Sequence, residues 1–331
     1  MIISKTPYRI SFFGGGTDFP KWYLENEGEV LSTSIDKYCY ISCRVLPPFF
    51  QHKHRFVYSI IEDVLSNQDI QHPAIRGVFN WLKIDKGMEI HHDGDLPARA
   101  GLGSSSSFTV GLLNALRAQN NGIYSKNELA RDAIYVEQKV IGENVGSQDQ
   151  IAASYGGFNH IKFGSHEDFK VSPVIISPDN KKLLNDHLLL FFTGIQRVAS
   201  EIEESKLKKM KENSTALSDI QGMVQESLGI ISRTDIKFNE FGELLYESWK
   251  LKKTLSSLVT NSKIDNAFQT AIDSGAIGGK ILGAGGGGFL LLFAEPHNHS
   301  SIKKKLSKLV HVPFSFDQLG SSIALYQPSG L

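Results

Sequence analysis

The fold of this chain is decided by one stretch, Leu96-Pro97-Ala98-Arg99-Ala100-Gly101-Leu102-Gly103-Ser104-Ser105-Ser106-Ser107, which an apolar helical pattern follows directly. A helix N-terminus exposes unpaired N–H groups and the positive end of the helix dipole, so anions bind there. Glycines at 101 and 103 remove the Cβ atoms that would keep a polyphosphate away from the backbone. Four serines exceed what an ordinary helix N-cap needs, and their hydroxyls suit phosphate oxygens or Mg²⁺. The stretch therefore predicts a phosphate-binding loop.

Two further glycine-rich segments lie far from this loop in the sequence. The first, Phe12-Phe13-Gly14-Gly15-Gly16-Thr17-Asp18, leaves a predicted strand and turns, and it lacks the third glycine of a dinucleotide-binding fingerprint. The second runs from Gly278 to Phe289 and has seven glycines in eleven residues before a buried apolar run. Such a segment is costly to order, and a close backbone approach to a ligand or to the 101–103 loop would explain that cost. Lys280 is not followed by Ser or Thr, so the P-loop signature is absent.

Two carboxylates stand near the predicted loop in the sequence. A helix opens at Ser125 with Glu128 three residues later, a capping-box pattern. Its predicted buried stripe consists of Leu129, Ala133, Val136 and Val140. Glu137 lies late on this helix, and Asp149 follows after a glycine-broken loop. If both converge on the phosphates, one could hold Mg²⁺ and the other could orient or deprotonate a hydroxyl. The spacing alone leaves open a solvated helix face and a loop turn.

Composition narrows the class of protein. The 331 residues include 35 basic and 35 acidic side chains, so the chain lacks the basic excess expected of a nucleic-acid-binding protein. No apolar run approaches the ~20 residues that span a bilayer, and the N-terminus lacks a signal-peptide pattern. The two cysteines, Cys39 and Cys43, share one face of a predicted strand and are expected to be reduced thiols. We expect a cytoplasmic globular protein that binds neither nucleic acid nor membrane.

The elements expected along the chain suggest two domains. Strands are predicted at Tyr8–Phe13, Val30–Ile35, Tyr38–Val45, Phe56–Ile61, Met88–His92, Phe158–Phe163, Leu188–Phe192 and Phe289–Phe293. Helices are predicted up to Trp81, at 107–118, from Ser125, and at 265–274 before Gly275. The charged stretch 201–212 is either a mobile lid or a charged helix. We place the boundary near residue 175, which gives domains 1–175 and 176–331.

Taken together and in this order, these segments resemble the motifs of the galactokinase–homoserine kinase–mevalonate kinase–phosphomevalonate kinase (GHMP) family. Pro7-x-Arg9 through Asp18 resembles the first motif, Pro97 to Ser106 the second and Gly279 to Phe289 the third, with Gln148-Asp149-Gln150 as a further match. The resemblance implies a two-domain α+β fold, with an N-terminal β-rich α/β domain and a C-terminal ferredoxin-like domain. It also implies an ATP-dependent small-molecule kinase whose ATP and substrate lie between the domains.

The resemblance assigns roles to individual residues. Ser105 and Glu137 match the Mg²⁺ ligands, Asp149 matches the base for the accepting hydroxyl, and Arg9 matches its basic partner. The ATP-binding residues implied are Pro97, Gly101, Leu102, Gly103, Ser104, Ser105, Ser106, Gly283, Gly285 and Gly286. The substrate-binding residues implied are Gly15, Gly16, Thr17, Asp18 and Arg197.

Within the family, Gly14 to Asp18, Gly146 to Gln150, Thr193 to Arg197 and Trp249 to Lys252 are similar to the branch that phosphorylates the anomeric hydroxyl of D-glycero-D-manno-heptose 7-phosphate. Such a substrate needs a cationic pocket, for which Arg197, Lys252, Arg76 and the 52–55 cluster are candidates. Arg99 either reaches a phosphate or is solvated. The alternatives are a fucose- or galactose-type sugar 1-kinase and a non-catalytic sugar or nucleotide sensor. The expected binding partner is a small-molecule sugar phosphate. The sequence leaves open whether the chain is a monomer or a homodimer.

Overall fold

The computed structural model describes residues 1–98, 100–166, 168–195, 199–233 and 238–328. Its larger sheet is built around the long strand β2 (Gly28–Val45), which pairs antiparallel with β1 (Ile2–Phe13), β5 (Met88–Gly94) and β6 (Phe158–Phe163). The short strands β3 (His54–Val57) and β4 (Ile61–Val64) extend the sheet beyond β5, and β7 (Phe169–Pro173) pairs with β6. The sequence predicted separate strands at Val30–Ile35 and Tyr38–Val45, whereas β2 runs unbroken through Asp36 and Lys37 in extended backbone.

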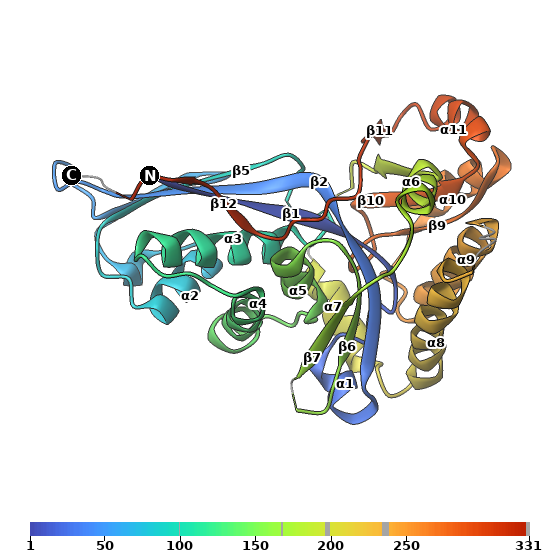
Figure 1. Cartoon of the computed structure of the whole chain (residues 1–331), viewed down its shortest axis with the longest axis horizontal. Coiled ribbons are helices and arrows are strands. Elements are labelled where there is room, and N and C mark those ends of the chain that lie inside the picture. Colours follow the sequence, from blue (N-terminus) through green and yellow to red (C-terminus); the bar gives the residue numbers. More distant parts are fainter. Residues whose placement is uncertain (99, 167, 196–198, 234–237, 329–331) are drawn as a thin grey trace.

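Helices cover one face of this sheet (Figure 1). They are α2 (Pro73–Leu82), α3 (Ser104–Gln119), α4 (Lys126–Tyr135) and α5 (Gln148–Tyr155), and α3 packs directly on β1 and β2. The Ser125–Glu128 capping box at the start of α4 is confirmed. Leu112, Leu113 and Leu116 of α3 are fully buried in the large core beneath the sheet. This packing fixes the N-terminus of α3, and with it the serine-rich first turn.

The predicted stripe on α4 is right for three residues and wrong for the fourth. Leu129, Ala133 and Val136 are buried, whereas Val140 is 38% exposed. The cause is a π-helical segment, Val136–Ile141, which follows α4 and widens each turn, so that Val140 leaves the buried face. Glu137, the second residue of this segment, lies in the interior and is 1% exposed.

The second sheet has the ferredoxin-like arrangement that the family resemblance implied. Its strands are β8 (Leu188–Phe192), β9 (Ala276–Ile281), β10 (Phe289–Ala294) and β11 (Val310–His311), in the order β11-β8-β10-β9. All neighbouring pairs are antiparallel, and helices separate β8 from β9 and β10 from β11, which is the βαββαβ sequence. The helices are α7 (Ala199–Lys208), α8 (Ser214–Ile231), α9 (Phe238–Thr254), α10 (Ser262–Asp273) and α11 (His299–Lys305).

The two sheets are linked by segments that cross between them. The remaining helices are α1 (Pro20–Asn26), which follows β1, and α6 (Pro178–Asp186), which precedes β8. Strand β12 (Ser322–Tyr326) lies after the second sheet in sequence but pairs antiparallel with β1, on the first sheet. Figure 1 shows β12 running beside β1. The predicted division near residue 175 stays a prediction, and the structure adds that the last strand returns to the first sheet.

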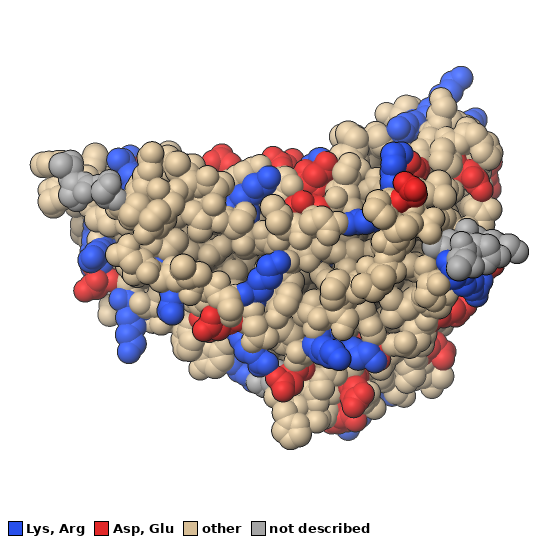
Figure 2. Space-filling view, viewed as in Figure 1, with Lys and Arg blue, Asp and Glu red and all other residues tan. Residues whose placement is uncertain are grey.

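The surface matches the balanced composition. Figure 2 shows Lys and Arg scattered among Asp and Glu on the visible face, without a large patch of one sign. Cys39 and Cys43 are buried free thiols on β2, as the alternation predicted. Among the described residues, no helix is long and apolar enough to cross a membrane.

Candidate active site

The serine-rich loop enters α3 through two glycines with positive φ angles. Gly101 has φ 84° and Gly103 has φ 74°, conformations that side chains with a Cβ rarely adopt, and Gly103 is the residue before α3 begins. Ser104, Ser105 and Ser106 form the first turn of α3, where N–H groups lack helical partners. Ser107 Oγ donates to the Pro7 carbonyl, 3.0 Å away, and so ties this turn to β1. The structure thus presents a helix N-terminus suited to an anion.

The glycine segment that runs from Gly278 to Phe289 packs against this loop. Close approach to the 101–103 loop was one of the two explanations that the sequence offered for its many glycines. A Cβ on Gly101 would lie 2.5 Å from the Leu282 carbonyl oxygen, and one on Gly283 would lie 2.5 Å from the Gly101 Cα. A Cβ on Gly288 would lie 2.3 Å from the Ala100 carbonyl oxygen. The glycines are therefore required for backbone-to-backbone contact between the two halves of the molecule.

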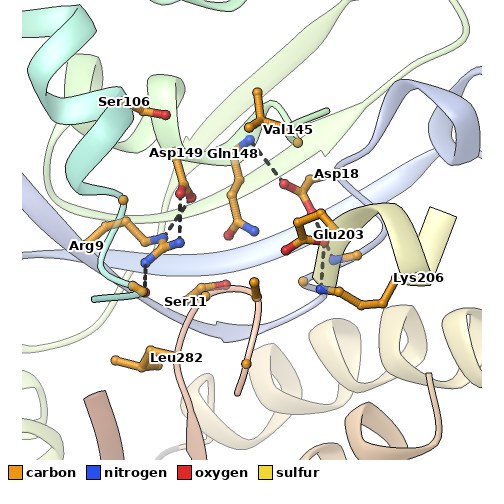
Figure 3. A pocket seen from close by; sticks show the side chains of 18 of the residues that line it. Arg9, Ser11, Asp18, Ser106, Val145, Gln148, Asp149, Glu203, Lys206 and Leu282 are labelled. Carbon is orange, nitrogen blue, oxygen red and sulfur yellow. Dashed lines mark hydrogen bonds and ion pairs between the residues drawn. The ribbon is translucent and has the colours of Figure 1, made fainter. Parts of the chain in front are cut away.

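A cavity of about 200 Å³ lies where the two glycine segments meet. Arg9 and Asp149 form a bidentate ion pair in its wall: Arg9 Nε donates to Oδ1 and Nη2 donates to Oδ2, each at 2.8 Å (Figure 3). Arg9 Nη1 also donates to the Gly101 carbonyl, at 2.7 Å. A Cβ on Gly103 would lie 3.3 Å from Asp149 Oδ2, so this glycine leaves room for the carboxylate beside the loop. The predicted base and its predicted partner are thus fixed next to the predicted phosphate site.

Asp18 occupies another end of the cavity. Its Oδ1 accepts from Gly16 N–H at 2.9 Å and its Oδ2 from Gln148 N–H at 3.4 Å. Burial, opposed by the Gly16 hydrogen bond, raises the Asp18 pKa to about 6, and the nearby Asp149 charge adds to the rise. In Figure 3, Gln148 lies between Asp18 and the Arg9–Asp149 pair. An acceptor held by Asp18 can therefore reach toward Asp149 across Gln148.

Glu137 lies behind the cavity wall and is joined to it by a serine. Ser106 Oγ donates to Glu137 Oε2 at 2.9 Å, and the Gln150 side-chain amide donates to the same oxygen. Burial raises the Glu137 pKa to about 7. Its Oε1 has no hydrogen-bond partner among the described residues. Ser105 is exposed on the cavity wall, whereas the serine in contact with Glu137 is Ser106.

The donor set fits a magnesium ion. Glu137 offers a buried carboxylate oxygen without a hydrogen-bond partner among the described residues, and the Ser106 hydroxyl lies beside the carboxylate; both are hard oxygen ligands of the kind that Mg²⁺ prefers. The described residues contain no group of three or more His, Cys, Asp or Glu side chains that could hold a metal. Mg²⁺ in nucleotide sites is usually held by one or two carboxylates together with substrate phosphates.

The other residues named from the sequence divide into two groups. Gly15, Gly16, Gly101, Gly103, Ser104, Ser105, Ser106, Gly283 and Gly285 line the cavity with Arg9, Asp18 and Asp149. Four others do not line it. Pro97 is exposed and Leu102 is buried in the core. The Thr17 hydroxyl donates to the Gly14 carbonyl and so holds the 14–17 turn, and the Gly286 N–H donates to the Val259 carbonyl. Arg197 and Arg99 lie outside the described residues. Lys252 lines the cavity, whereas Arg76 and the 52–55 cluster lie elsewhere on the molecule.

Three charged wall residues were not predicted as part of the site. Glu203 and Lys206 project from α7, where they pair with each other at 2.7 Å, and Lys280 projects from β9. The charged stretch that the sequence left undecided is therefore helical over Ala199–Lys208, and its inner face reaches the cavity. Charged residues occur all around this helix, at 201, 203, 204, 206 and 208, so the sequence alone did not show which of them face the cavity.

Comparison with known proteins identifies the class. The family model described as GHMP kinases N terminal domain matches residues 69–157, and the model described as GHMP kinases C terminal matches residues 233–311. The chain is 30% identical over 322 residues to a D-glycero-alpha-D-manno-heptose 7-phosphate kinase of Campylobacter jejuni, covering 93% of each. It is 26% identical to a bifunctional fucokinase/GDP-fucose pyrophosphorylase of Arabidopsis thaliana, covering 87% of this chain but 29% of that protein.

Solved structures confirm the fold. A crystal structure of a D-glycero-D-manno-heptose 1-phosphate kinase from Bacteroides thetaiotaomicron superposes with a TM-score of 0.79 at 23% identity, covering 97% of this chain and 98% of that one. The fold and the site together define a small-molecule kinase that uses ATP as its phosphate donor and an alcohol group as acceptor. The chain belongs to the GHMP kinase family.

Proposed function

We propose that this sugar kinase of the GHMP family transfers the γ-phosphoryl group of ATP to the anomeric hydroxyl of a heptose 7-phosphate, in the route to a nucleotide-activated heptose. The observation that carries the proposal is the Asp149 carboxylate, held by two hydrogen bonds from Arg9 beside Gly103 of the phosphate loop. The relative from Campylobacter jejuni, similar along nearly the whole chain, supports the choice of sugar. The lysines of the cavity wall suit a substrate that already carries a phosphate.

The residues divide the work of an in-line transfer. Asp149 accepts the proton of the acceptor hydroxyl while that oxygen forms a bond to the γ-phosphorus and the bond from phosphorus to the ADP oxygen breaks. Arg9 keeps the carboxylate in place and lies close to the charge of the moving phosphoryl group. The N–H groups at the start of α3 and the serines from 104 to 106 hold the nucleotide phosphates.

Substrate and metal would be held by the groups flanking this centre. We propose that Asp18 and the turn at Gly15 and Gly16 bind sugar hydroxyls, because the Asp18 carboxylate is anchored by two backbone N–H groups and faces the cavity. Glu137 with Ser105 or Ser106 would hold Mg²⁺, which when bound would neutralise charge on the nucleotide phosphates. The two domains proposed from the sequence, 1–175 and 176–331, would contribute opposite walls.

The test is ADP release by the purified protein with a panel of acceptors: heptose 7-phosphate, the unphosphorylated heptose, L-fucose and D-galactose. We expect release only with the heptose 7-phosphate, and a ³¹P NMR signal of a new anomeric phosphate next to the original one. This spectrum also decides the position of transfer, on which the names of the two heptose kinases differ. Preference for an unphosphorylated sugar would reject the heptose phosphate and favour the fucose type, to which the Arabidopsis relative points. Binding without any transfer would instead favour a sensor.

A further inference from the structure

Two buried lysines enter the cavity from the second sheet and its covering helix. Lys252 is on α9 and Lys280 is on β9, and both are more than nine-tenths buried while still lining the cavity. Long cationic side chains are rarely buried to this degree unless an anion or a carboxylate compensates them. Neither lysine belongs to the base, metal or hydroxyl-binding groups assigned above, and the proposed function uses the wall lysines only as cations that suit a phosphorylated substrate.

The protein contacts of both ammonium groups are main-chain carbonyls. Lys280 Nζ donates to the Phe12 carbonyl at 2.7 Å. Lys252 Nζ donates to the carbonyls of Ile281, at 2.8 Å, and Gly283. An ammonium group has three donors, so at least one N–H of each lysine is not used by these bonds. Within the described part of the chain, neither lysine has a carboxylate within ion-pair distance.

The neighbouring charges do not neutralise the pair. Arg9 and Lys206 also face this region, and their positive charges repel the Lys280 ammonium group and lower its pKa. The carboxylates of Asp149 and Glu203 are each already paired, with Arg9 and with Lys206, while Asp18 accepts two backbone N–H groups. Among the described residues, four cations thus face three carboxylates at the cavity, an excess of one positive charge when all are ionised. The excess lies on the Lys252 and Lys280 side.

We propose that Lys252 and Lys280 form the binding site for a phosphate dianion within the cleft. The position supports this ligand, because the Gly283 carbonyl held by Lys252 belongs to the loop that contacts Gly101 of the phosphate loop. The dianion is either the γ-phosphoryl group of the nucleotide or the phosphate ester of the acceptor, and both present the same oxygens. The inference rests on the proposed function only for the choice between these two sources.

The protonation of the pair provides a signature that a purely structural lysine would lack. Burial, then the Arg9 and Lys206 charges, lower the Lys280 pKa to about 7, and burial with the Lys280 charge lowers the Lys252 pKa well below its usual range. At pH 8 the empty site therefore lacks part of its charge. A dianion favours the protonated ammonium form, so binding should take up protons from solution.

The first experiment uses orthophosphate as the probe and the full-length protein without sugar. Calorimetric titration at pH 8 in two buffers of different ionisation enthalpy measures affinity and proton uptake together. We expect proton uptake with the wild type, and an affinity at least about tenfold weaker, with smaller proton uptake, in Lys252→Met and Lys280→Met. The matched control is Lys250→Met, whose exposed lysine on the same helix pairs with Glu247. It should behave as the wild type.

The same variants separate ligand binding from a role in folding. Replacing a buried cation by methionine of similar length should leave the melting temperature unchanged or higher in Lys280→Met. Lys252→Met loses two carbonyl contacts and is expected to melt somewhat lower, so Lys280→Met is the variant that decides. A folded Lys280→Met with unchanged orthophosphate affinity and unchanged proton uptake would overturn the proposal.

Steady-state kinetics then identifies the source of the dianion. If the site holds the γ-phosphoryl group, both variants lose kcat, on the order of 100-fold, with any acceptor that the wild type uses. If it holds the acceptor's phosphate, KM rises for the phosphorylated acceptor, while kcat at saturation and the KM for ATP stay close to those of the wild type. Failure of the heptose assignment would leave the orthophosphate result intact, so the two failures can be told apart.

Discussion

Asp149 and Glu137 are two acids that serve one cleft, and their surroundings are opposite. Asp149 is partly exposed on the cavity wall, and the protein itself supplies its counter-charge through Arg9. Glu137 is buried behind the wall, where the Ser106 hydroxyl and the Gln150 amide donate to it, and burial raises its pKa to about 7. The difference shows which charge the fold completes and which it leaves to a ligand. The negative charge of Asp149 is neutralised by Arg9 within the protein, whereas that of Glu137 needs a proton or a bound cation.

The largest effect on kcat is expected from substitution of Asp149, the acid paired with Arg9. Asp149→Asn removes the proton acceptor but keeps the shape of the side chain, so kcat should fall about 10³-fold while nucleotide affinity changes little. Single-turnover kinetics and a nucleotide titration measure the two quantities. The control is Asp168→Asn, an exposed carboxylate that pairs with Arg131 outside the cavity. Turnover close to that of the wild type in Asp149→Asn would reject its role as base.

The next effect tests the counter-charge. Arg9→Met leaves the Asp149 carboxylate without its partner and frees the Gly101 carbonyl, so kcat should fall about 100-fold or more. Arg9→Lys should recover only part of this loss, because an ammonium group cannot form the two parallel hydrogen bonds of the guanidinium. The measurement is kcat for the three proteins at saturating substrate. Full recovery in the lysine variant would show that charge alone, and not the bidentate geometry, is required.

The third prediction concerns Glu137 and the dependence of the free energy of unfolding on pH. Because the Glu137 pKa is raised from 4.5 to about 7, the folded protein binds more protons than the unfolded one between these values. The Glu137 carboxyl therefore stabilises the fold least above pH 7, and its contribution falls by at most a few kcal/mol as the pH rises from 4.5 to 7. Urea unfolding at several pH values should show this fall in wild type and not in Glu137→Gln. Addition of Mg²⁺ with nucleotide should make this fall in the stability of the wild type smaller.

The smallest effect distinguishes two neighbouring serines. Ser106→Ala removes the hydroxyl that donates to Glu137 and should lower the free energy of unfolding by about 1 kcal/mol. Ser105→Ala changes an exposed wall residue and should cost less than about 0.5 kcal/mol, while raising the Mg²⁺ concentration needed for half-maximal activity. Urea unfolding and a Mg²⁺ titration of activity measure both. Equal Mg²⁺ dependence in Ser105→Ala and the wild type would move the metal contact to Ser106.

Local signals in the sequence were enough to predict several elements around the proposed phosphate site. Glycine and serine at 101–106, the capping box at Ser125 and the apolar run at 289–293 each depend on neighbouring residues, and the structure confirms all three as predicted elements. The ferredoxin-like arrangement and the meeting of Arg9 with Asp149 came from resemblance to the family, because residues 140 positions apart carry no local signal of contact.

The misses have physical causes that act beyond the local pattern. Val140 was placed on the buried face because a regular helical period was assumed, and the π-helical turn changes that period. Glu203 and Lys206 lie in the stretch that the sequence left open between a lid and a charged helix, and Lys280 was considered only as a P-loop lysine; the packing of α7 and β9 brings all three to the cavity. Asp36 and Lys37 were left out of both predicted strands, but pairing with β1 on either side of them keeps β2 continuous.

The return of β12 to β1 has a consequence for how the enzyme is synthesised. During translation, β1, which carries Arg9, leaves the ribosome first and has β2 on one side only, because the strand that covers its other side is made after the whole second sheet. A fragment that stops at residue 311, where the C-terminal family match ends, would keep every motif yet expose an open strand edge. Co-translational folding of the first half is therefore expected to remain incomplete until residue 326 has emerged.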